Sequence, residues 1–335
     1  MICVVGLGSI GRRHVRNAVS LGAEVVALRT GRAHPDVPDL DVAITETNAQ
    51  DSAIAMRPAL AVIANPTHLH CRDATAFANA GIPVLIEKPL SHTLDGLDAL
   101  ETALTRTRAR GFVGYMMRFD PGIAALKRAI DAGEIGPVHT ASVEWSTHLP
   151  DWHPWEDYKE SYAARADMGG GVVLTCSHEI DLALHLFGPC DRVFAMGGRK
   201  TALDIAAEDC VSALLEHAGG TTTQLSLSYA HRPGHRAIRT IGEDGAAEWD
   251  FFTGKTILRH ADGSAETIHD GPDASAVNAL YLDELETVLA ALDSGHATPV
   301  DYAEGRRTLE VCLAILASIE TGRPVTPHGH GTRNP

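Results

Sequence analysis

The chain lacks an excess of basic side chains: 28 lysines and arginines stand against 43 aspartates and glutamates, and the formal net charge is −15. A protein that binds nucleic acid carries a basic face that neutralises phosphates. The charge balance therefore argues against a nucleic-acid partner, although a local basic pocket for a small anion remains compatible with it.

Long apolar runs, paired cysteines and metal-binding motifs are also missing. No apolar stretch approaches the roughly 18 residues that cross a membrane, so we expect no membrane partner. The six cysteines form no CxxC pair, which is typical of reduced thiols in a cytoplasmic protein. Eighteen histidines are present, but no HExxH or CxxC motif accompanies them, and we expect no metal site.

The first 118 residues alternate short apolar runs with helical patterns. Continuous apolar strands separated by helices are typical of βαβ units and of a doubly wound parallel sheet. We therefore predict an α/β Rossmann domain over residues 1–118. The expected strands are Ile2–Val5, Glu24–Leu28, Ala59–Ala64, Pro83–Glu87 and Phe112–Tyr115.

The pattern changes after residue 118. Apolar and polar residues alternate along Val138–Leu149, which indicates a strand with one solvated face. Short turns join the strand candidates that follow, so we predict a C-terminal α+β domain over residues 119–323 with a large, mainly antiparallel open sheet. The expected strands are Val138–Leu149, Arg192–Met196, Asp209–His217, Thr221–Ala230, Ala237–Ile241, Ala246–Phe251 and Thr256–His260.

The second domain is expected to bind substrate and to form oligomers. Few helices are available to cover its sheet, and a free face of that size would bury itself against a symmetry mate. We therefore expect a homodimer or homotetramer joined through this sheet. The last helix, Tyr302–Thr321, is expected to pack back on the first domain, and residues 324–335 are expected to form a mobile tail.

A glycine-rich turn, Gly6-Leu-Gly8-Ser9-Ile10-Gly11, follows the first strand and opens the first helix. The first glycine permits a tight turn, the second lets the backbone approach a pyrophosphate, and the third lets helix and strand pack closely. The helix N-terminus then offers free N–H groups to the phosphates. A purely structural glycine turn is the alternative, but the strand and helix stand where a dinucleotide site needs them.

The end of the second strand reads Leu28-Arg29-Thr30-Gly31-Arg32, where an NAD site would normally carry a carboxylate for the ribose hydroxyls. Guanidinium groups pair well with a 2′-phosphate. The sequence therefore favours NADP, with NAD as a possible cofactor. The alternative is that both arginines are solvated loop residues.

Four motifs occur in an ordered set. They are Val4-Val-Gly-Leu-Gly-Ser-Ile-Gly-Arg-Arg-His14, Ala64-Asn-Pro-Thr-His-Leu-His70, Glu87-Lys-Pro-Leu90 and Gly114-Tyr-Met-Met-Arg-Phe119. The set resembles the glucose–fructose oxidoreductase, inositol dehydrogenase and rhizopine-catabolism (Gfo/Idh/MocA) family from Met1 to about Arg323. This resemblance implies an NAD(P)-dependent oxidoreductase. The cofactor contacts that it implies outside the glycine turn are Asn65, Pro66, Thr67, His70, Glu87, Lys88 and Arg118.

Lys88 matches the catalytic lysine of that family, and Tyr115 is expected to line the same cleft. Lys88 is one of only five lysines beside 23 arginines. It follows an apolar run at the end of the fifth strand, where an open α/β sheet presents its ligand crevice. A lysine there can exchange a proton with a substrate hydroxyl as hydride leaves the carbon. A snorkelling surface lysine is the alternative reading of the residues alone.

A second cluster follows the run Gly169-Gly-Gly171. His178, Asp181 and His185 share one helical face, and His178 matches the family's catalytic histidine. The family also places a carboxylate one turn earlier, whereas this chain has Leu174 and Thr175 there. Three alternatives follow: Asp181 orients the imidazole from the other side, the proton relay shortens to Lys88 and His178, or catalysis is weak or altered.

The segment His148–Tyr158 combines tryptophans with carboxylates and imidazoles. Such a mixture suits a sugar, because rings stack on its C–H face while polar groups bind its hydroxyls; a structural lid packed by its own tryptophans is the alternative. The expected substrate is a sugar, amino sugar, nucleotide sugar or cyclitol. The residues expected to contact it are Lys88, Tyr115, Trp152, His153, Thr175 and His178.

Three functions remain open at this point. The first is a dehydrogenase or reductase of such a substrate. The second is a lyase or hydrolase that keeps its dinucleotide bound and oxidises only transiently. The third is a dinucleotide sensor without catalysis, which the missing carboxylate near Thr175 makes conceivable.

Overall fold

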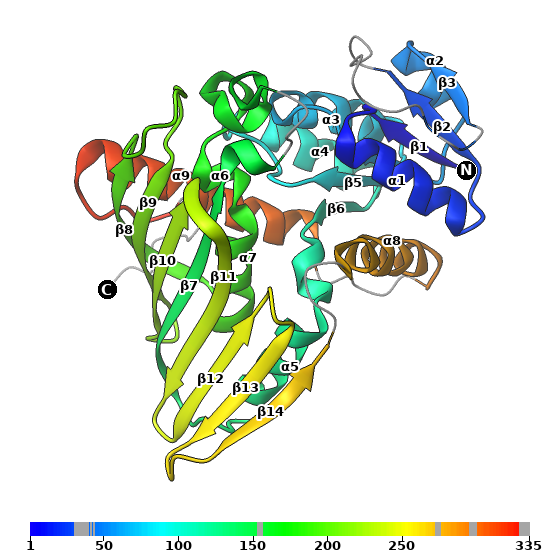
Figure 1. Ribbon diagram of the computed structural model, residues 1–335. Helices are drawn as coiled ribbons and strands as arrows, with labels where there is room; N and C mark the ends of the chain where they lie inside the picture. The colour runs from blue at the N-terminus through cyan, green and yellow to red at the C-terminus, as the bar shows by residue number, and fades with distance from the viewer. Residues whose placement is uncertain are drawn as a thin grey trace. The chain divides into compact units, whose positions relative to one another are not determined.

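The structure is a computed structural model that describes residues 1–29, 40, 42, 44–152, 157–271, 276–294 and 300–327. The chain divides into two compact units (Figure 1). The first contains Met1–Tyr115, Asp167–Gly169 and Tyr281–Arg306, and the second contains Met116–Ala166, Gly170–Leu280 and Arg307–Pro335. Within the described part of the chain, no helix is both long and apolar enough to span a membrane.

The first unit is built on a six-stranded sheet with the strand order β3-β2-β1-β4-β5-β6. Every neighbouring pair is parallel, and the residues of β1, β2, β4 and β5 are buried throughout because helices cover both faces. The strands are β1 Ile2–Val5, β2 Val25–Leu28, β3 Thr45–Thr47, β4 Leu60–Ile63, β5 Val84–Glu87 and β6 Gly111–Gly114. The predicted Rossmann sheet is confirmed.

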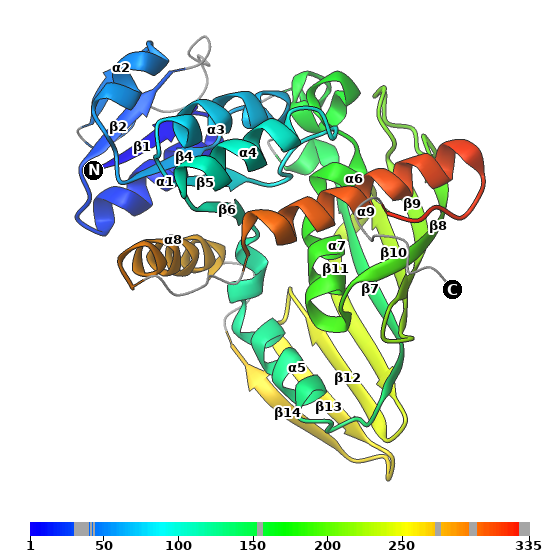
Figure 2. The same ribbon diagram turned by 180° about the vertical axis from the view of Figure 1, so that it is seen from behind.

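Helices pack on both faces of this sheet (Figures 1 and 2). Val15 of α1 and Leu285 and Val288 of α8 belong to one hydrophobic cluster with alternate residues of the strands, such as Ile2 and Val62. Helices α3 and α4 pack together and α3 contacts β4 and β5. The helices of this unit are α1 Ser9–Ser20, α2 Gln50–Ala55, η1 Thr67–Leu69, α3 His70–Asn79, α4 Leu97–Thr107 and parts of α8 Val277–Ser294 and α9 Tyr302–Thr321.

The second unit is built on an eight-stranded sheet with the strand order β14-β13-β12-β11-β7-β10-β9-β8. Only β7 and β10 pair in parallel, and the other neighbours are antiparallel. The predicted mainly antiparallel open sheet is confirmed. The strands are β7 Val138–His148, β8 Cys190–Gly198, β9 Cys210–His217, β10 Thr222–Ser228, β11 Ala230–Gly242, β12 Gly245–Asp250, β13 Lys255–His260 and β14 Ala265–Asp270.

Helices cover one face of this second sheet, as Figure 2 shows. Helix α5 approaches β12 so closely that a Cβ on Gly122 would lie 2.6 Å from the Trp249 ring. Ser318 of α9 accepts a hydrogen bond from the Ala195 amide of β8 at 2.9 Å. The helices of this unit are η2 Met116–Phe119, α5 Pro121–Asp131, η3 Leu149–Asp151, η4 Tyr158–Glu160, η5 Tyr162–Ala164, η6 Ala166–Met168, α6 Val172–Thr175 and α7 Ser177–Phe187.

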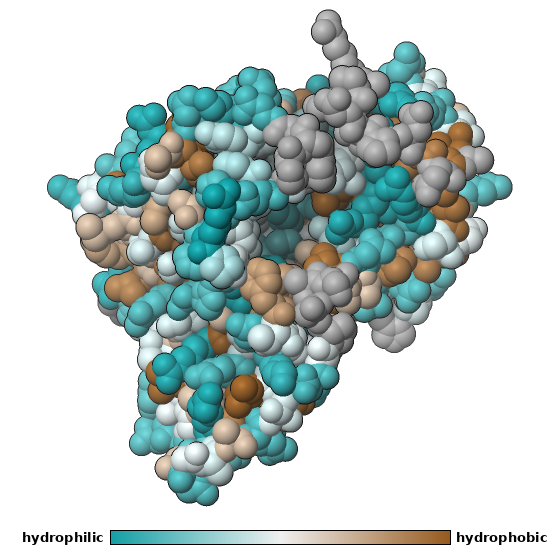
Figure 3. Space-filling view, viewed as in Figure 1, coloured by the Kyte–Doolittle hydropathy of each residue, from teal (hydrophilic) through white to brown (hydrophobic). Residues whose placement is uncertain are grey.

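The opposite face of the second sheet carries exposed apolar side chains in this chain. Phe194, Met196 and Leu214 are 36%, 69% and 47% exposed, and they stand on the neighbouring strands β8 and β9. Figure 3 shows hydrophobic residues among hydrophilic ones over these strands.

A partly buried carboxyl group, Glu208, joins the start of β9 to α6. Its main-chain oxygen accepts the Val172 amide at 2.9 Å, and its Oε1 accepts the Val173 amide at 3.1 Å. Gly171 has a φ of +102°, and a Cβ there would lie 2.3 Å from the carboxylate. Burial raises the pKa of Glu208 to about 6, because the charged form loses its hydration.

We predict that Glu208→Gln removes a pH dependence of stability. Because the folded pKa is raised above an ordinary value of about 4.3, the protonated form stabilises the fold fully below that pH, and this stability is lost as pH rises through about 6. The amide mimics the protonated acid, so the free energy of unfolding should match wild type at acidic pH and exceed it by about 2 kcal/mol at neutral pH.

Urea unfolding across this pH range measures the effect. Glu243→Gln is the matched control, because Glu243 is exposed and its side chain pairs only at the surface with His139. Parallel pH profiles of stability for wild type and Glu208→Gln would contradict the account.

Candidate active site

The glycine turn between β1 and α1 has no room for side chains at two of its glycines. Gly6 has a φ of +91°, and a Cβ there would lie 2.8 Å from the Asn65 Cα. A Cβ on Gly11 would lie 2.0 Å from the Gly6 carbonyl oxygen. Both approaches bring α1 tightly against β1 and β4, as the packing role of these glycines requires.

Gly8 differs from its neighbours because a Cβ there would meet nothing within 4 Å. It is the N-cap of α1, carries no side chain to cap the helix, and is followed by Ser9 and Ile10 in a first turn without acidic residues. The positive end of the helix dipole therefore faces an open approach, which suits a phosphate group.

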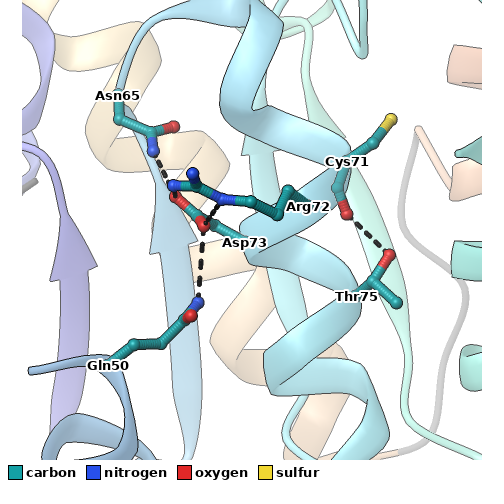
Figure 4. A network of polar contacts seen from close by, with 6 residues as sticks. All are labelled: Gln50, Asn65, Cys71, Arg72, Asp73 and Thr75. Carbon is teal, nitrogen blue, oxygen red and sulfur yellow. Dashed lines mark hydrogen bonds and ion pairs between the residues drawn. The ribbon is translucent and has the colours of Figure 1, made fainter. Parts of the chain in front are cut away.

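Asn65 lies in the turn after β4 and is held by a polar network (Figure 4). Its Nδ2 donates to Asp73 Oδ2 at 2.5 Å, and the buried Asp73 also accepts from Arg72 at 2.7 Å and from Gln50 at 3.5 Å. A carboxylate can only accept hydrogen bonds, so the Asn65 amide must present its NH₂ group to Asp73.

This orientation leaves Asn65 Oδ1 buried without a hydrogen-bond partner among the described residues. An unsatisfied buried acceptor costs free energy, and a donor on a bound molecule would recover it. The orphaned oxygen, the tight contact with Gly6 and the open approach at Gly8 together fit the dinucleotide expected from the sequence.

His70 connects the turn after β4 to the end of β5. Its Nε2 lies 2.8 Å from the Asn65 carbonyl oxygen and its Nδ1 lies 3.0 Å from the Pro89 carbonyl oxygen. Burial lowers the pKa of His70 below its usual range, against the opposing effect of these carbonyls. A neutral ring carries one N–H and can donate to only one of the two carbonyls at a time. The ring nevertheless lies between the two turns, so its position is structural as well as close to the expected cofactor.

Glu87 and Lys88 stand at the carboxyl end of β5. Glu87 is buried, its Oε1 lies 2.6 Å from His14 Nε2 on α1, and its Oε2 accepts the Lys88 amide at 3.2 Å. Burial raises the pKa of Glu87, but His14 and Lys88 outweigh it and the net pKa is lowered. The ionised carboxylate thus fixes the backbone of Lys88, whose side chain is only partly buried.

Several other predicted residues of the first unit can be placed. Tyr115 directly follows β6 and is fully buried, Thr67 is buried in η1, and Pro66 is the exposed N-cap of η1. Arg29 follows β2 and pairs with Glu46 of β3. Thr30 and Arg32 lie outside the described residues.

Two buried ion pairs hold α7, and two of the predicted residues, Arg118 and Asp181, form one of them. Arg118 donates to both oxygens of Asp181 at 2.9 and 2.8 Å, and Thr308 Oγ1 lies 3.3 Å from Asp181 Oδ1. Arg236 donates to Glu179 at 2.7 Å. Glu179 and Asp181 follow His178 directly in α7, so these pairs fix the start of the helix that carries it.

Asp181 therefore already serves as the partner of a buried arginine. Removing one member of such a pair is strongly destabilising. Asp181 therefore has a structural role in addition to its predicted role of orienting the His178 imidazole. Arg118, expected at the cofactor, is buried in the same pair. His185 lies one turn further along α7, and burial lowers its pKa to about 4.

Trp152 belongs to a cluster of aromatic rings. Its ring centroid lies 5.2 Å from that of Trp145 and 5.5 Å from that of Tyr229, both in edge-to-face geometry, and its Nε1 donates to Thr147 at 2.7 Å. The packing agrees with a lid held by its own aromatic side chains. Thr175 is buried at the end of α6, and His153 lies outside the described residues.

Three residues of these networks carried no functional signal in the sequence. Asp73 orients Asn65, His14 holds Glu87, and Glu46 holds Arg29. His14 is part of the first motif, but nothing in the spacing predicts its partner 73 residues away. The parallel strand order brings these residues together: β1, β4 and β5 are neighbours near His14 and Glu87, and β2 and β3 are neighbours near Arg29 and Glu46.

Models of known protein families match both the N-terminal and the C-terminal part of the chain. Residues 1–115 match the model described as "Oxidoreductase family, NAD-binding Rossmann fold", and residues 123–248 match the GFO/IDH/MocA C-terminal domain. Inositol 2-dehydrogenase 1 of Saccharopolyspora erythraea is 38% identical over 96% of this chain and 94% of its own. The NAD(+)-dependent scyllo-inositol 2-dehydrogenase of Bacillus subtilis is 28% identical over 96% and 94%.

A solved structure shares the fold. The WlbA dehydrogenase of Bordetella pertussis, in complex with NADH and UDP-GlcNAcA, superposes with a TM-score of 0.82 over 97% of this chain and 96% of its own, at 21% identity.

We predict opposite effects of two alanine substitutions in the glycine turn. Gly11→Ala places a Cβ 2.0 Å from the Gly6 carbonyl, and overpacking of this kind should lower the free energy of unfolding by about 1–3 kcal/mol. Gly8→Ala adds a methyl group to open space at a φ of −69°, so stability should stay within about 0.5 kcal/mol. The same methyl should block the pyrophosphate and weaken dinucleotide binding.

Thermal unfolding and titration with NADH and NADPH, followed by protein fluorescence, measure the two effects separately. If Gly8→Ala bound both dinucleotides as wild type does, the turn would not be the phosphate site.

Proposed function

This chain belongs to the Gfo/Idh/MocA family of NAD(P)-dependent oxidoreductases, and from that membership we propose that it transfers a hydride between a nicotinamide dinucleotide and a secondary alcohol or ketone of a sugar or cyclitol. The resemblance inferred from the four sequence motifs is thereby confirmed.

The arrangement at the carboxyl edge of the first sheet carries this proposal. β1, β4 and β5 are parallel neighbours, so the glycine turn, Asn65 and Lys88 follow strands that end at the same edge. Ligands of open α/β sheets bind at this edge. A dinucleotide held by the turn would therefore lie beside a partly buried lysine whose backbone Glu87 fixes.

The residues of this chain supply binding and proton transfer. Bound NAD(P) provides the carbon that accepts or gives the hydride. In the oxidation direction, the Lys88 amine takes the hydroxyl proton as the C–H hydride leaves, and in the reduction direction the ammonium returns that proton to the carbonyl oxygen. Both directions balance charge at the substrate oxygen.

His178 is the proposed second group of the site. We expect it to meet Lys88 beside the substrate, to hold or relay the proton, and to be supported by Tyr115 and Thr175. The ion pairs of Glu179 and Asp181 support this role because they hold the helix turn that presents His178.

The substrate class follows from the relatives and from the aromatic cluster. Two relatives are named inositol dehydrogenases. Trp145 and Trp152 are both partly exposed, and the apolar faces of such rings suit stacking against a sugar or cyclitol ring. Amino sugars and nucleotide sugars remain within this class. The proposal places Trp152 and His153 at the substrate.

The proposed cofactor is NADP, with NAD as a usable alternative. Arg29 supports it, because a guanidinium at the end of β2 can pair with a 2′-phosphate. We also propose that the enzyme works in the cytoplasm, where thiols stay reduced, since all six cysteines are free in the structure.

We further propose a homodimer or homotetramer joined through the second sheet. The exposed apolar residues Phe194, Met196 and Leu214 support it. The predicted molar mass from light scattering at micromolar concentration is at least twice that of the chain, and Met196→Glu together with Leu214→Glu should shift it toward the monomer because charge opposes apolar burial. A wild-type monomer would contradict this assembly.

Turnover by the Lys88→Ala variant tests the chemistry. A panel of inositols and sugars is screened with NADP and NAD by absorbance at ~340 nm, the nicotinamide band. For the best substrate, Lys88→Ala should lower turnover about 10²- to 10⁴-fold while dinucleotide affinity changes little. Lys255→Ala, at an exposed position of β13, is the control and should turn over normally.

The other outcomes of this screen are also informative. Substrate consumption without net change in absorbance would replace the proposal by a lyase or hydrolase that oxidises only transiently. Dinucleotide binding without any turnover across the substrate class would indicate a sensor.

A further inference from the structure

The edge of the first sheet carries an ion pair at the expected position of the adenosine ribose. Arg29 follows β2, and its Nε and Nη2 donate to Glu46 Oε2 and Oε1 at 2.6 and 2.8 Å. The two side chains are 35% and 40% exposed. The pair is thus bidentate in geometry but open to a ligand.

The register of the strands explains why these two side chains meet. β2 and β3 are parallel, and Ala27 lies opposite Glu46. Side chains two residues apart on a strand share a face, so Arg29 extends on the face of Ala27 and reaches Glu46. The Arg29 amide donates to the Thr47 carbonyl at 2.9 Å, which holds its backbone beside β3.

We propose that Glu46 is a specificity-determining residue that competes with the 2′-phosphate of NADP for Arg29 and so sets the preference between NADP and NAD. This inference rests on the proposed function, because it assumes that a dinucleotide binds along the carboxyl edge of the sheet.

The charges at this edge support the competition. The hydrogen bond from Arg29 lowers the pKa of Glu46, and Arg12 contributes to the same effect, so the carboxylate is ionised at neutral pH. Arg12 is itself anchored to the glycine turn, because its Nε donates to the Leu7 carbonyl at 2.9 Å. A phosphate adding about two negative charges would have to displace a carboxylate already seated on Arg29.

NAD has no group that requires Arg29 to be released. Its 2′-hydroxyl is neutral, and the carboxylate of Glu46 neither repels it nor competes with it for a guanidinium. The pair therefore penalises NADP selectively, and the chain should use both dinucleotides with a narrow preference while Glu46 is present.

Five proteins are titrated with NADPH and NADH, and the dissociation constants test the proposal without any substrate. Glu46→Gln should bind NADPH up to about fivefold more tightly than wild type, because an exposed ion pair is worth at most about 1 kcal/mol. Its affinity for NADH should stay within about twofold. Glu24→Gln removes the same charge at the opposite end of β2, where Glu24 is exposed, and should change neither affinity.

Arg29→Gln, alone and combined with Glu46→Gln, completes a double-mutant cycle with wild type and Glu46→Gln. On the Arg29→Gln background, Glu46→Gln should no longer improve NADPH binding selectively, because the residue for which Glu46 and the phosphate compete is absent. An unchanged ratio of NADPH to NADH affinity in Glu46→Gln, with both dinucleotides binding, would overturn this inference and leave the proposed function intact. Failure of wild type to bind either dinucleotide would overturn both.

Discussion

The close contact between the glycine turn and the turn after β4 is the constraint on which the first unit depends. Gly6 leaves no room for a Cβ against Asn65, and Gly11 leaves none against the Gly6 carbonyl. This contact sets where α1 begins, and it brings the buried Oδ1 of Asn65 to the edge where the helix presents its free amides. The phosphate cradle is therefore a consequence of backbone packing, with side chains supplying its orientation.

The same helix connects the cradle to the proposed proton-transfer group. His14 stands in the second turn of α1 and bonds to Glu87, which in turn accepts the Lys88 amide. Removing either partner of this buried pair would destabilise the fold, because the other partner would be left as an uncompensated polar group in the core. Dinucleotide site and lysine thus belong to one rigid frame. A displacement of α1 would therefore also shift the Lys88 backbone through His14 and Glu87.

Sequence patterns predicted the parallel sheet because β1, β2, β4, β5 and β6 are apolar runs bounded by helices. They missed β3, whose residues Thr45–Thr47 are polar and too few for a recognisable run, and β14, whose residues are mostly exposed. Glu46 was therefore invisible as a partner of Arg29. Glu208 was missed for a related reason, since its burial depends on Gly171 and α6 folding over it. Periodicity reports which face of an element is buried, whereas these pairs depend on strand order and register.

The proposed function requires one dinucleotide to bind per chain at the carboxyl edge of the first sheet. Isothermal titration of the wild-type protein with NADPH measures this binding. We expect saturation at about one site per chain with a dissociation constant in the micromolar range or below, as is usual for cofactors of this class. Heats no larger than dilution for both NADPH and NADH would contradict it.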